Sequence, residues 1–160
     1  MYALRPRDMQ KSGANVVFVD EKIFPQILAV MTTRAIPQGI QIRTGKYSEM
    51  EMTPDIFACI LQYPNASGNV EDYRTFVEKA HAANCKVAVA ADILSLALLT
   101  PPGEWGADIV FGTTQRLGTP MFYGGPSAGY FATRDEYKRN IPGRIIGWSK
   151  DKYGKLCYRM

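Results

Sequence analysis

The chain has 160 residues, 46% of them hydrophobic and 21% charged, a composition typical of a soluble globular domain with its own core. Its net charge of +4 comes from 19 basic and 15 acidic residues, and no nucleic-acid-binding motif accompanies the basic excess late in the chain. No apolar stretch approaches the roughly 20 residues of a membrane span, and the first residues lack the apolar run of a secretory signal. We therefore expect a cytoplasmic protein that binds neither nucleic acid nor membrane, with basic side chains such as Arg144 and Lys150 facing solvent or a partner.

The cysteines and the histidine do not form the pattern of a metal site. Cys59, Cys85 and Cys157 are odd in number and far apart in the sequence, and His81 is the only histidine. This spacing argues against both a zinc site and a disulfide framework. We expect Cys59, which lies in an apolar run, to be a small buried hydrophobe, and His81 to be a structural residue at the surface.

Strand-like and helix-like segments alternate along the first half of the chain. Residues 14–20 form a short β-branched run that ends in an acid, and residues 24–34 carry apolar positions at helical spacing, with a proline in the first turn. Residues 37–39 break this helix, and residues 40–42 resume an extended pattern. Residues 55–64 are predicted to form a buried strand that a proline closes.

The alternation continues in the second half. Residues 65–68 form a loop, and residues 70–84 are predicted to form a helix with one apolar stripe, made of Tyr73, Phe76, Val77 and Ala80. Residues 86–92 form another apolar strand that ends in an acid. The apolar run at residues 108–111 stops at Gly112, and a second short strand-like run follows after a glycine-rich turn.

These short apolar runs are typical of a sheet that is covered on both faces. Strands that alternate with helices predict an α/β fold, with a mostly parallel sheet and helices on both faces. Ligands of such sheets bind beyond the carboxyl ends of the strands. We therefore expect the loops at residues 62–68, 92–95 and 112–116 to lie near one another.

Asp92 is the most informative acid in these loops. It follows the apolar run of residues 87–91, so it would be partly desolvated at the carboxyl end of its strand. Such a carboxylate could pair with a protonated ring nitrogen, as in pyridoxal-phosphate enzymes, or simply cap the segment 93–99. Thr113 and Thr114 could bind a phosphate or satisfy backbone groups at the strand end, so these residues alone leave both interpretations open.

Several standard site motifs are missing from the sequence. It contains neither the GxGxxG dinucleotide fingerprint nor a P-loop, which argues against an α/β nucleotide-binding domain. The GxSxG turn of serine hydrolases is also missing. The local motifs therefore predict neither a metal-binding nor a catalytic residue.

Three segments resemble the glycine cleavage system P-protein family, the glycine decarboxylases. The most specific is ADIVFGTTQRLGTPMFYGGPSAGYFATRDEYKRNIPGRIIGWSKD, residues 107–151. The others are LQYPNASGNVEDY, residues 61–73, and AADILSLALLTPPGEWGADIV, residues 90–110. The resemblance runs in order from about Gly13 to Lys150, and it implies the large-domain fold of fold-type I pyridoxal-phosphate-dependent transferases.

The resemblance also implies which part of such an enzyme the chain is. P-proteins contain two homologous halves, and only the C-terminal half carries the Schiff-base lysine, in a His-Lys pair. Here Gln115-Arg116 stands in that position, so the chain resembles a fragment of the N-terminal, non-lysine half. We expect residues 1–160 to form a single partial domain, the central part of the large domain, without a second domain.

Arginine at this position has a chemical consequence. A Schiff base needs an amine that can lose its proton, whereas a guanidinium stays charged and is a poor nucleophile. We therefore expect no catalytic residue and no covalently bound pyridoxal phosphate in this chain, although the whole enzyme uses that cofactor. Asp92, Thr114, Gln115 and Arg116 are expected to form a vestigial cofactor-binding pseudo-site.

The family further implies a reaction and its partners. Its members decarboxylate glycine on pyridoxal phosphate and pass the aminomethyl group to the lipoyl arm of H-protein. We expect this chain to be inactive alone and to work with the catalytic half of the P-protein in an oligomer, in the cytoplasm, or in mitochondria if the source is eukaryotic. The alternative is a non-catalytic half that supports the catalytic half through its structure and its surface.

Overall fold

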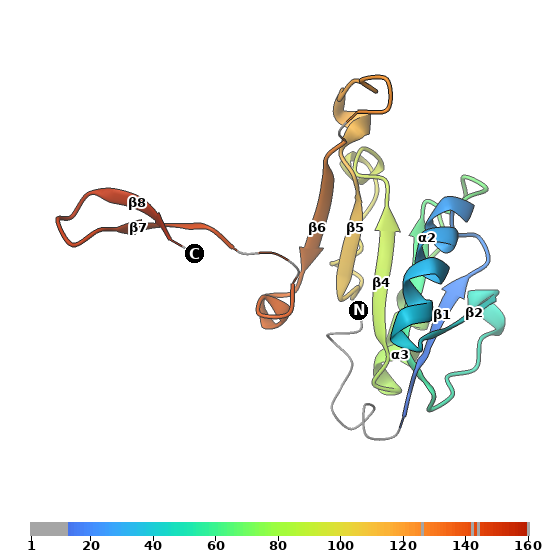
Figure 1. The fold of residues 1–160 in the computed structure, drawn as a ribbon. Coiled ribbons are helices and arrows are strands. Elements are labelled where there is room, and N and C mark those ends of the chain that lie inside the picture. The colour runs from blue at the N-terminus through green and yellow to red at the C-terminus, as the bar shows by residue number, and fades with distance from the viewer. Residues whose placement is uncertain (1–12, 126, 142, 144, 160) are drawn as a thin grey trace.

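The computed structural model describes residues 13–125, 127–141, 143 and 145–159 (Figure 1). Its body is a six-stranded sheet of order β2-β1-β3-β4-β5-β6, in which neighbouring strands are parallel except β6, which runs antiparallel to β5. The strands are β1 (Val16–Asp20), β2 (Gln41–Gly45), β3 (Ile56–Tyr63), β4 (Lys86–Ala91), β5 (Ile109–Thr113) and β6 (Gly129–Thr133). A separate antiparallel hairpin is formed by β7 (Gly147–Lys150) and β8 (Leu156–Arg159).

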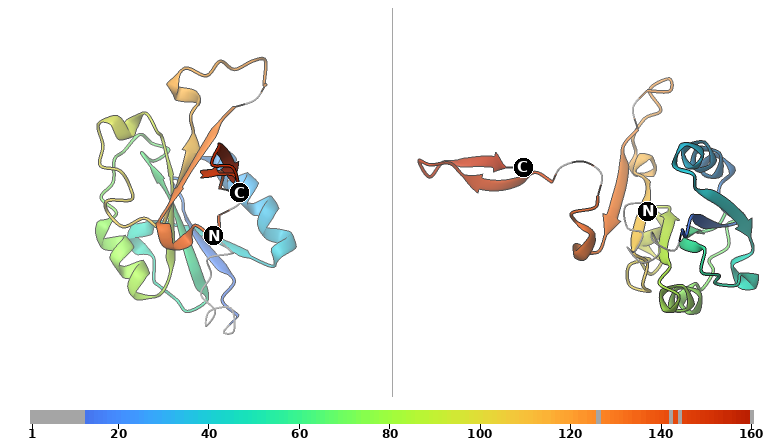
Figure 2. Two further views of the ribbon diagram at one scale, coloured as in Figure 1. Left: turned by 90° about the vertical axis from the view of Figure 1, so that its left-hand side faces the viewer. Right: turned by 60° about the horizontal axis from the view of Figure 1, so that its bottom comes forward.

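Two α-helices, α2 (Pro25–Ala35) and α3 (Arg74–Ala82), cover opposite faces of this sheet (Figures 1 and 2). One core cluster joins α3 to β3 and β4, and its members include Phe76, Val77, Ala80, Leu61, Val87 and Val89. The other joins α2 to β1 and β3, and its members include Ile27, Leu28, Met31, Val17, Val19 and Ile60. The expected α/β fold, with a mostly parallel sheet and helices on both faces, is therefore confirmed.

The burial of the strands explains why their sequences do not alternate. Every residue of β1 and β3 is buried, because helices cover both faces of the sheet at these central strands. Single 3₁₀ turns occupy several connections, namely η2 (Ile36–Gln38), η3 (Tyr47–Glu49), η4 (Ser95–Ala97), η5 (Gln115–Leu117) and η6 (Asp135–Tyr137). Among the described residues, no helix is both long and apolar enough to cross a bilayer.

Three details differ from the sequence-based expectations. The helix expected over residues 70–84 begins only at Arg74, where the Asp72 carboxylate accepts the Arg74 N–H at 3.1 Å and fixes the preceding turn. The segment 93–99, which Asp92 could have capped, contains only a single 3₁₀ turn and no α-helix. The β7–β8 hairpin was not expected, because its alternating aromatic and basic residues do not form an apolar run. Arg144, one of the basic residues named above, lies outside the described residues.

Candidate functional site

The loops that follow β3, β4 and β5 meet at one edge of the sheet, as expected for parallel strands. There the ends of these strands, the turns after β4 and β5 and the start of α2 surround a pocket of about 440 Å³, to which the loop after β3 contributes no lining residue. The lining residues are Phe24, Gln26, Ile27, Gln62, Ala90, Ala91, Asp92, Phe111, Gly112, Thr113 and Arg116. An apolar concavity with a few convergent polar groups is the usual form of a small-molecule site.

Asp92 holds the turn that follows β4. Its carboxylate oxygen Oδ1 accepts the N–H of Leu94 at 3.1 Å, and its backbone carbonyl accepts the Ser95 hydroxyl at 2.7 Å. Asp92 therefore stabilises the turn before η4 but does not cap it, because the N-cap residue is Leu94 and no side chain caps that turn. The other carboxylate oxygen of Asp92, Oδ2, lies 3.5 Å from Nη1 of Arg116. The sequence alone did not identify Arg116 as the partner of the Asp92 carboxylate.

Arg116 lies on the 3₁₀ turn η5, directly after β5, and its side chain is 62% exposed. Because the pair with Asp92 is largely solvated, it stabilises the fold by only about 0–1 kcal/mol. Its chemical effect is more important. A permanently charged guanidinium occupies the edge of the pocket and neutralises the one carboxylate among the lining residues.

The polar residues on either side of Arg116 bind the backbone. The hydroxyl of Thr114 donates to the carbonyl of Ala128 at 2.9 Å, and the hydroxyl of Thr113 accepts the N–H of Gln115 at 3.2 Å. Thr114 and Gln115 are not among the lining residues, whereas Thr113 is. Of the four residues expected to form the pseudo-site, the structure therefore brings Asp92 and Arg116 together in the pocket, with Thr114 and Gln115 beside it.

Gln62 was expected at the start of the loop 62–68 without a role for its side chain, whereas it lies in β3 and lines the pocket. Its side chain is 2% exposed, and Oε1 has no hydrogen-bond partner among the described residues. A buried, unpartnered amide oxygen is costly, and such groups are rare outside functional sites. The available signal was a polar residue within the otherwise apolar run that forms β3.

Gly112 brings β5 very close to its neighbours at this edge. A Cβ atom on Gly112 would lie 2.3 Å from the carbonyl oxygen of Ala91 and 2.6 Å from Cε1 of Tyr130. The Tyr130 hydroxyl also donates to that carbonyl at 2.8 Å, which ties β6 to β4. Glycine is therefore required here, for close packing rather than for an unusual backbone conformation.

The pocket residues do not fit covalently bound pyridoxal phosphate. None of the residues that line the pocket in the described part of the chain is a lysine, so no amine is present there to form a Schiff base. Lys86 cannot substitute, because it lies at the start of β4, at the opposite end of that strand from the pocket, where it contacts Tyr137. The carboxylate of Asp92 already has Arg116 as its counter-ion.

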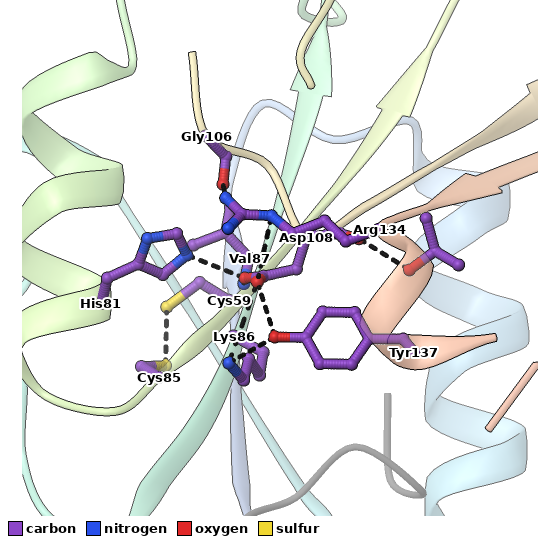
Figure 3. Close-up of polar contacts among 10 residues, drawn as sticks. Cys59, His81, Cys85, Lys86, Val87, Gly106, Asp108, Arg134 and Tyr137 are labelled. Carbon is purple, nitrogen blue, oxygen red and sulfur yellow. Dashed lines mark hydrogen bonds and ion pairs between the residues drawn. The ribbon is translucent and has the colours of Figure 1, made fainter. Parts of the chain in front are cut away.

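A second polar cluster surrounds the buried carboxylate of Asp108, at the opposite edge of the sheet (Figure 3). The carboxylate accepts hydrogen bonds from the Val87 N–H and from His81 Nε2, both at 2.8 Å, and from the Tyr137 hydroxyl at 3.2 Å. Lys86 Nζ and Arg134 Nε each lie 3.9 Å from it. His81 is therefore structural, as expected, but it lies partly buried in this cluster rather than at the open surface.

Lys86 has an altered acidity in this cluster. Burial by itself would lower the pKa of the ammonium group, but the hydrogen bond to the Tyr137 hydroxyl at 2.6 Å and the charge of Asp108 outweigh it. The pKa of Lys86 is therefore raised, and the residue stays charged. Its role is to balance Asp108.

The three cysteines are free thiols, and two of them meet in the core. Cys59 Sγ and Cys85 Sγ lie 3.4 Å apart, and both residues are buried (Figure 3). The contact with Cys85, followed by desolvation, raises the pKa of the Cys59 thiol well above its usual value. Cys59 is thus the buried, inert hydrophobe that was expected. In the described part of the chain, no group of three or more His, Cys, Asp or Glu side chains could hold a metal ion.

Comparison with known proteins supports the family that the sequence segments resemble. The family model described as "Glycine cleavage system P-protein" matches residues 3–160. The chain is 85% identical over its whole length to a "Glycine dehydrogenase (decarboxylating)" of Bacteroides fragilis, and 52% identical to that of Flavobacterium johnsoniae. In both cases it spans only 17% of the relative's length.

Solved structures extend the comparison to the fold. A crystal structure of glycine decarboxylase (P-protein) of the glycine cleavage system matches 98% of this chain and 36% of its own, with a TM-score of 0.83 and 32% identity. A cystathionine gamma synthase from Xanthomonas oryzae pv. oryzae matches 80% of this chain with a TM-score of 0.64 at 18% identity, a likeness of fold alone. The chain belongs to the glycine cleavage system P-protein family.

Proposed function

We propose that this chain is part of the N-terminal, non-lysine half of a glycine dehydrogenase (decarboxylating). The whole enzyme would decarboxylate glycine on pyridoxal phosphate and transfer the aminomethyl group to lipoyl H-protein. One observation carries the proposal: at the end of β5, Arg116 lies 3.5 Å from Asp92, and the described residues that line the pocket include no lysine. No step of the decarboxylation is assigned to this chain.

The residues of the pocket have a supporting role in this proposal. Phe24, Ile27 and Phe111 supply an apolar lining that limits water, and the Asp92–Arg116 pair fills the polar edge. Pyridoxal phosphate acts as an electron sink only where it is held for attack on the substrate, which requires the lysine of the catalytic half. The pocket is therefore a pseudo-site.

The proposal includes the setting of the chain. Residues 1–160 would be the central part of a large domain, a single partial domain that works with the catalytic half in an oligomer. The enzyme would act in the cytoplasm, or in mitochondria if the source is eukaryotic. Lipoyl H-protein would be its partner and glycine its substrate.

Covalent trapping in the full-length enzyme tests this function. Borohydride reduction should leave a pyridoxyl adduct on a lysine outside these 160 residues and none within them. Carbon dioxide release from labelled glycine should need the full-length enzyme, and the isolated chain should not exceed a heat-killed control. A trapped adduct on any lysine of this chain would overturn the proposal.

The connection between β5 and β6 favours the alternative function, in which this non-catalytic half supports the catalytic half through its surface. Three apolar residues of this connection are strongly exposed, namely Met121 at 78%, Phe122 at 56% and Tyr123 at 111%. Phe122 and Tyr123 also have positive φ angles of 47° and 54°, an unfavourable conformation for bulky residues that packing normally has to enforce. In the full-length enzyme, Tyr123→Ser should weaken association of the two halves, whereas Leu98→Ser, at a residue 94% exposed, should not.

A further inference from the structure

The β7–β8 hairpin, residues 147–159, is ordered within itself but projects away from the sheet (Figures 1 and 2). We call it the arm. Its turn is held by Asp151, whose Oδ1 accepts the N–H groups of Tyr153 at 2.8 Å and Lys155 at 2.9 Å. Gly154, with a φ of 83°, completes the turn. An isolated two-stranded hairpin is only marginally stable in water, so the arm lacks the packing that such a structure needs.

One face of the arm carries three large apolar side chains, with Lys150 beside Leu156 at its end. The register pairs Trp148 with Tyr158 and places Leu156 two residues from Tyr158 on the same face. Their exposed fractions are 72%, 71% and 68%, and the two rings lie 5.0 Å apart between centroids. Exposed Trp and Tyr side chains in contact are typical of the energetic centre of a protein interface.

The arm is also strongly basic. It contains one acidic residue, Asp151, and four basic residues, so its formal charge is +3. The basic residues are Lys150, Lys152, Lys155 and Arg159. A surface that accepts this arm must therefore offer an apolar depression with carboxylates around its rim.

We infer that the arm docks into such a depression on the part of the same enzyme that lies outside these 160 residues. The chain spans 17% of the relatives' length, so most of each such polypeptide is available as the occupant. The match to the P-protein crystal structure covers 98% of this chain, which extends it into the arm, but only 36% of that P-protein chain. The inference rests on the proposed function only for the identity of the enzyme.

Hydroxyl-radical footprinting of the full-length enzyme tests the docking, with a free peptide of the arm sequence as reference. We expect Trp148 and Tyr158 to be oxidised about ten times more slowly in the enzyme than in the peptide. Rates within threefold of the peptide would overturn the inference. Protection that needs added H-protein, or that is lost when subunits separate on dilution, would also overturn it, since the occupant would then be H-protein or a second copy.

Variants separate docking from general stability. In the full-length enzyme, Trp148→Ala should raise the oxidation rate of Leu156 about fivefold, whereas the control Leu98→Ala should leave it unchanged. Lys152→Glu, an exposed substitution with no effect expected on folding, should raise the rate at Trp148 at least twofold at low salt, and Lys79→Glu on α3 should not. Equal effects of each variant and its control would contradict the inference. No measurement here uses glycine turnover, so a failed decarboxylase assay would overturn the proposed function and leave the docking intact.

Discussion

Arg116 Nη1 and Asp92 Oδ2 lie 3.5 Å apart at the edge of the pocket, although the two residues follow different strands. The guanidinium is therefore the counter-ion of the carboxylate that would otherwise face a ligand. The pair therefore places a guanidinium, rather than an amine, beside the acid that lines the pocket.

Arg116→Lys in the full-length enzyme should create a reactive amine at the edge of the pocket. With excess pyridoxal phosphate and borohydride, we expect a trapped adduct at residue 116, because a lysine can deprotonate and attack the aldehyde. Peptide mass spectrometry would detect it. Arg116→Gln is the matched control and should give none, and equal labelling of the two variants would contradict the prediction.

Asp108→Asn should loosen the opposite edge of the sheet. The substitution removes the charge that Lys86 and Arg134 face and weakens the hydrogen bonds to a charged acceptor, a loss of about 1.5–3 kcal/mol. Amide exchange at Val87, whose N–H donates to this carboxylate, should accelerate about a hundredfold in the full-length enzyme. Asp135→Asn, in a pair at the surface, is the control, and an unchanged rate at Val87 would argue against the role of Asp108.

Gly112→Ala should destabilise the sheet at the pocket. The added Cβ would lie 2.3 Å from a backbone carbonyl, which cannot move as a flexible side chain can, so we expect a loss of about 1–3 kcal/mol. The thermal midpoint of the full-length enzyme measures this loss. Gly103→Ala, where a Cβ meets nothing within 4 Å, should leave the midpoint almost unchanged. A similar midpoint for both variants would show that β5 can shift.

Asp20 should make stability depend on pH. Burial, only partly offset by the N–H of Tyr47, raises the pKa of its carboxyl above 3.8. A raised pKa favours the protonated form in the folded state, so this contribution is present below about pH 4 and is lost as the pH rises through the folded-state pKa. The thermal midpoint of Asp20→Asn minus that of the unsubstituted enzyme should therefore grow between pH 4 and 7. A constant difference would contradict the prediction.

The sequence by itself determined the positions of the central strands and the lack of a Schiff-base amine at residue 116. Helices cover both faces of β1 and β3, so continuous apolar runs marked them directly. Arg116 excluded a Schiff base through the chemistry of its side chain alone. These features are local, and local features can be deduced without knowing which residues lie opposite them.

Only the tertiary structure decided which side chains meet. The Asp92–Arg116 pair and the cluster of His81 around Asp108 both depend on the register of neighbouring strands and on the packing of α3. The buried Oε1 of Gln62 likewise acquires its meaning only when a pocket forms beside it. Contacts between distant segments are set by strand pairing and helix packing, which no stretch of sequence specifies alone, and the projecting arm adds a surface that the sequence pattern did not indicate.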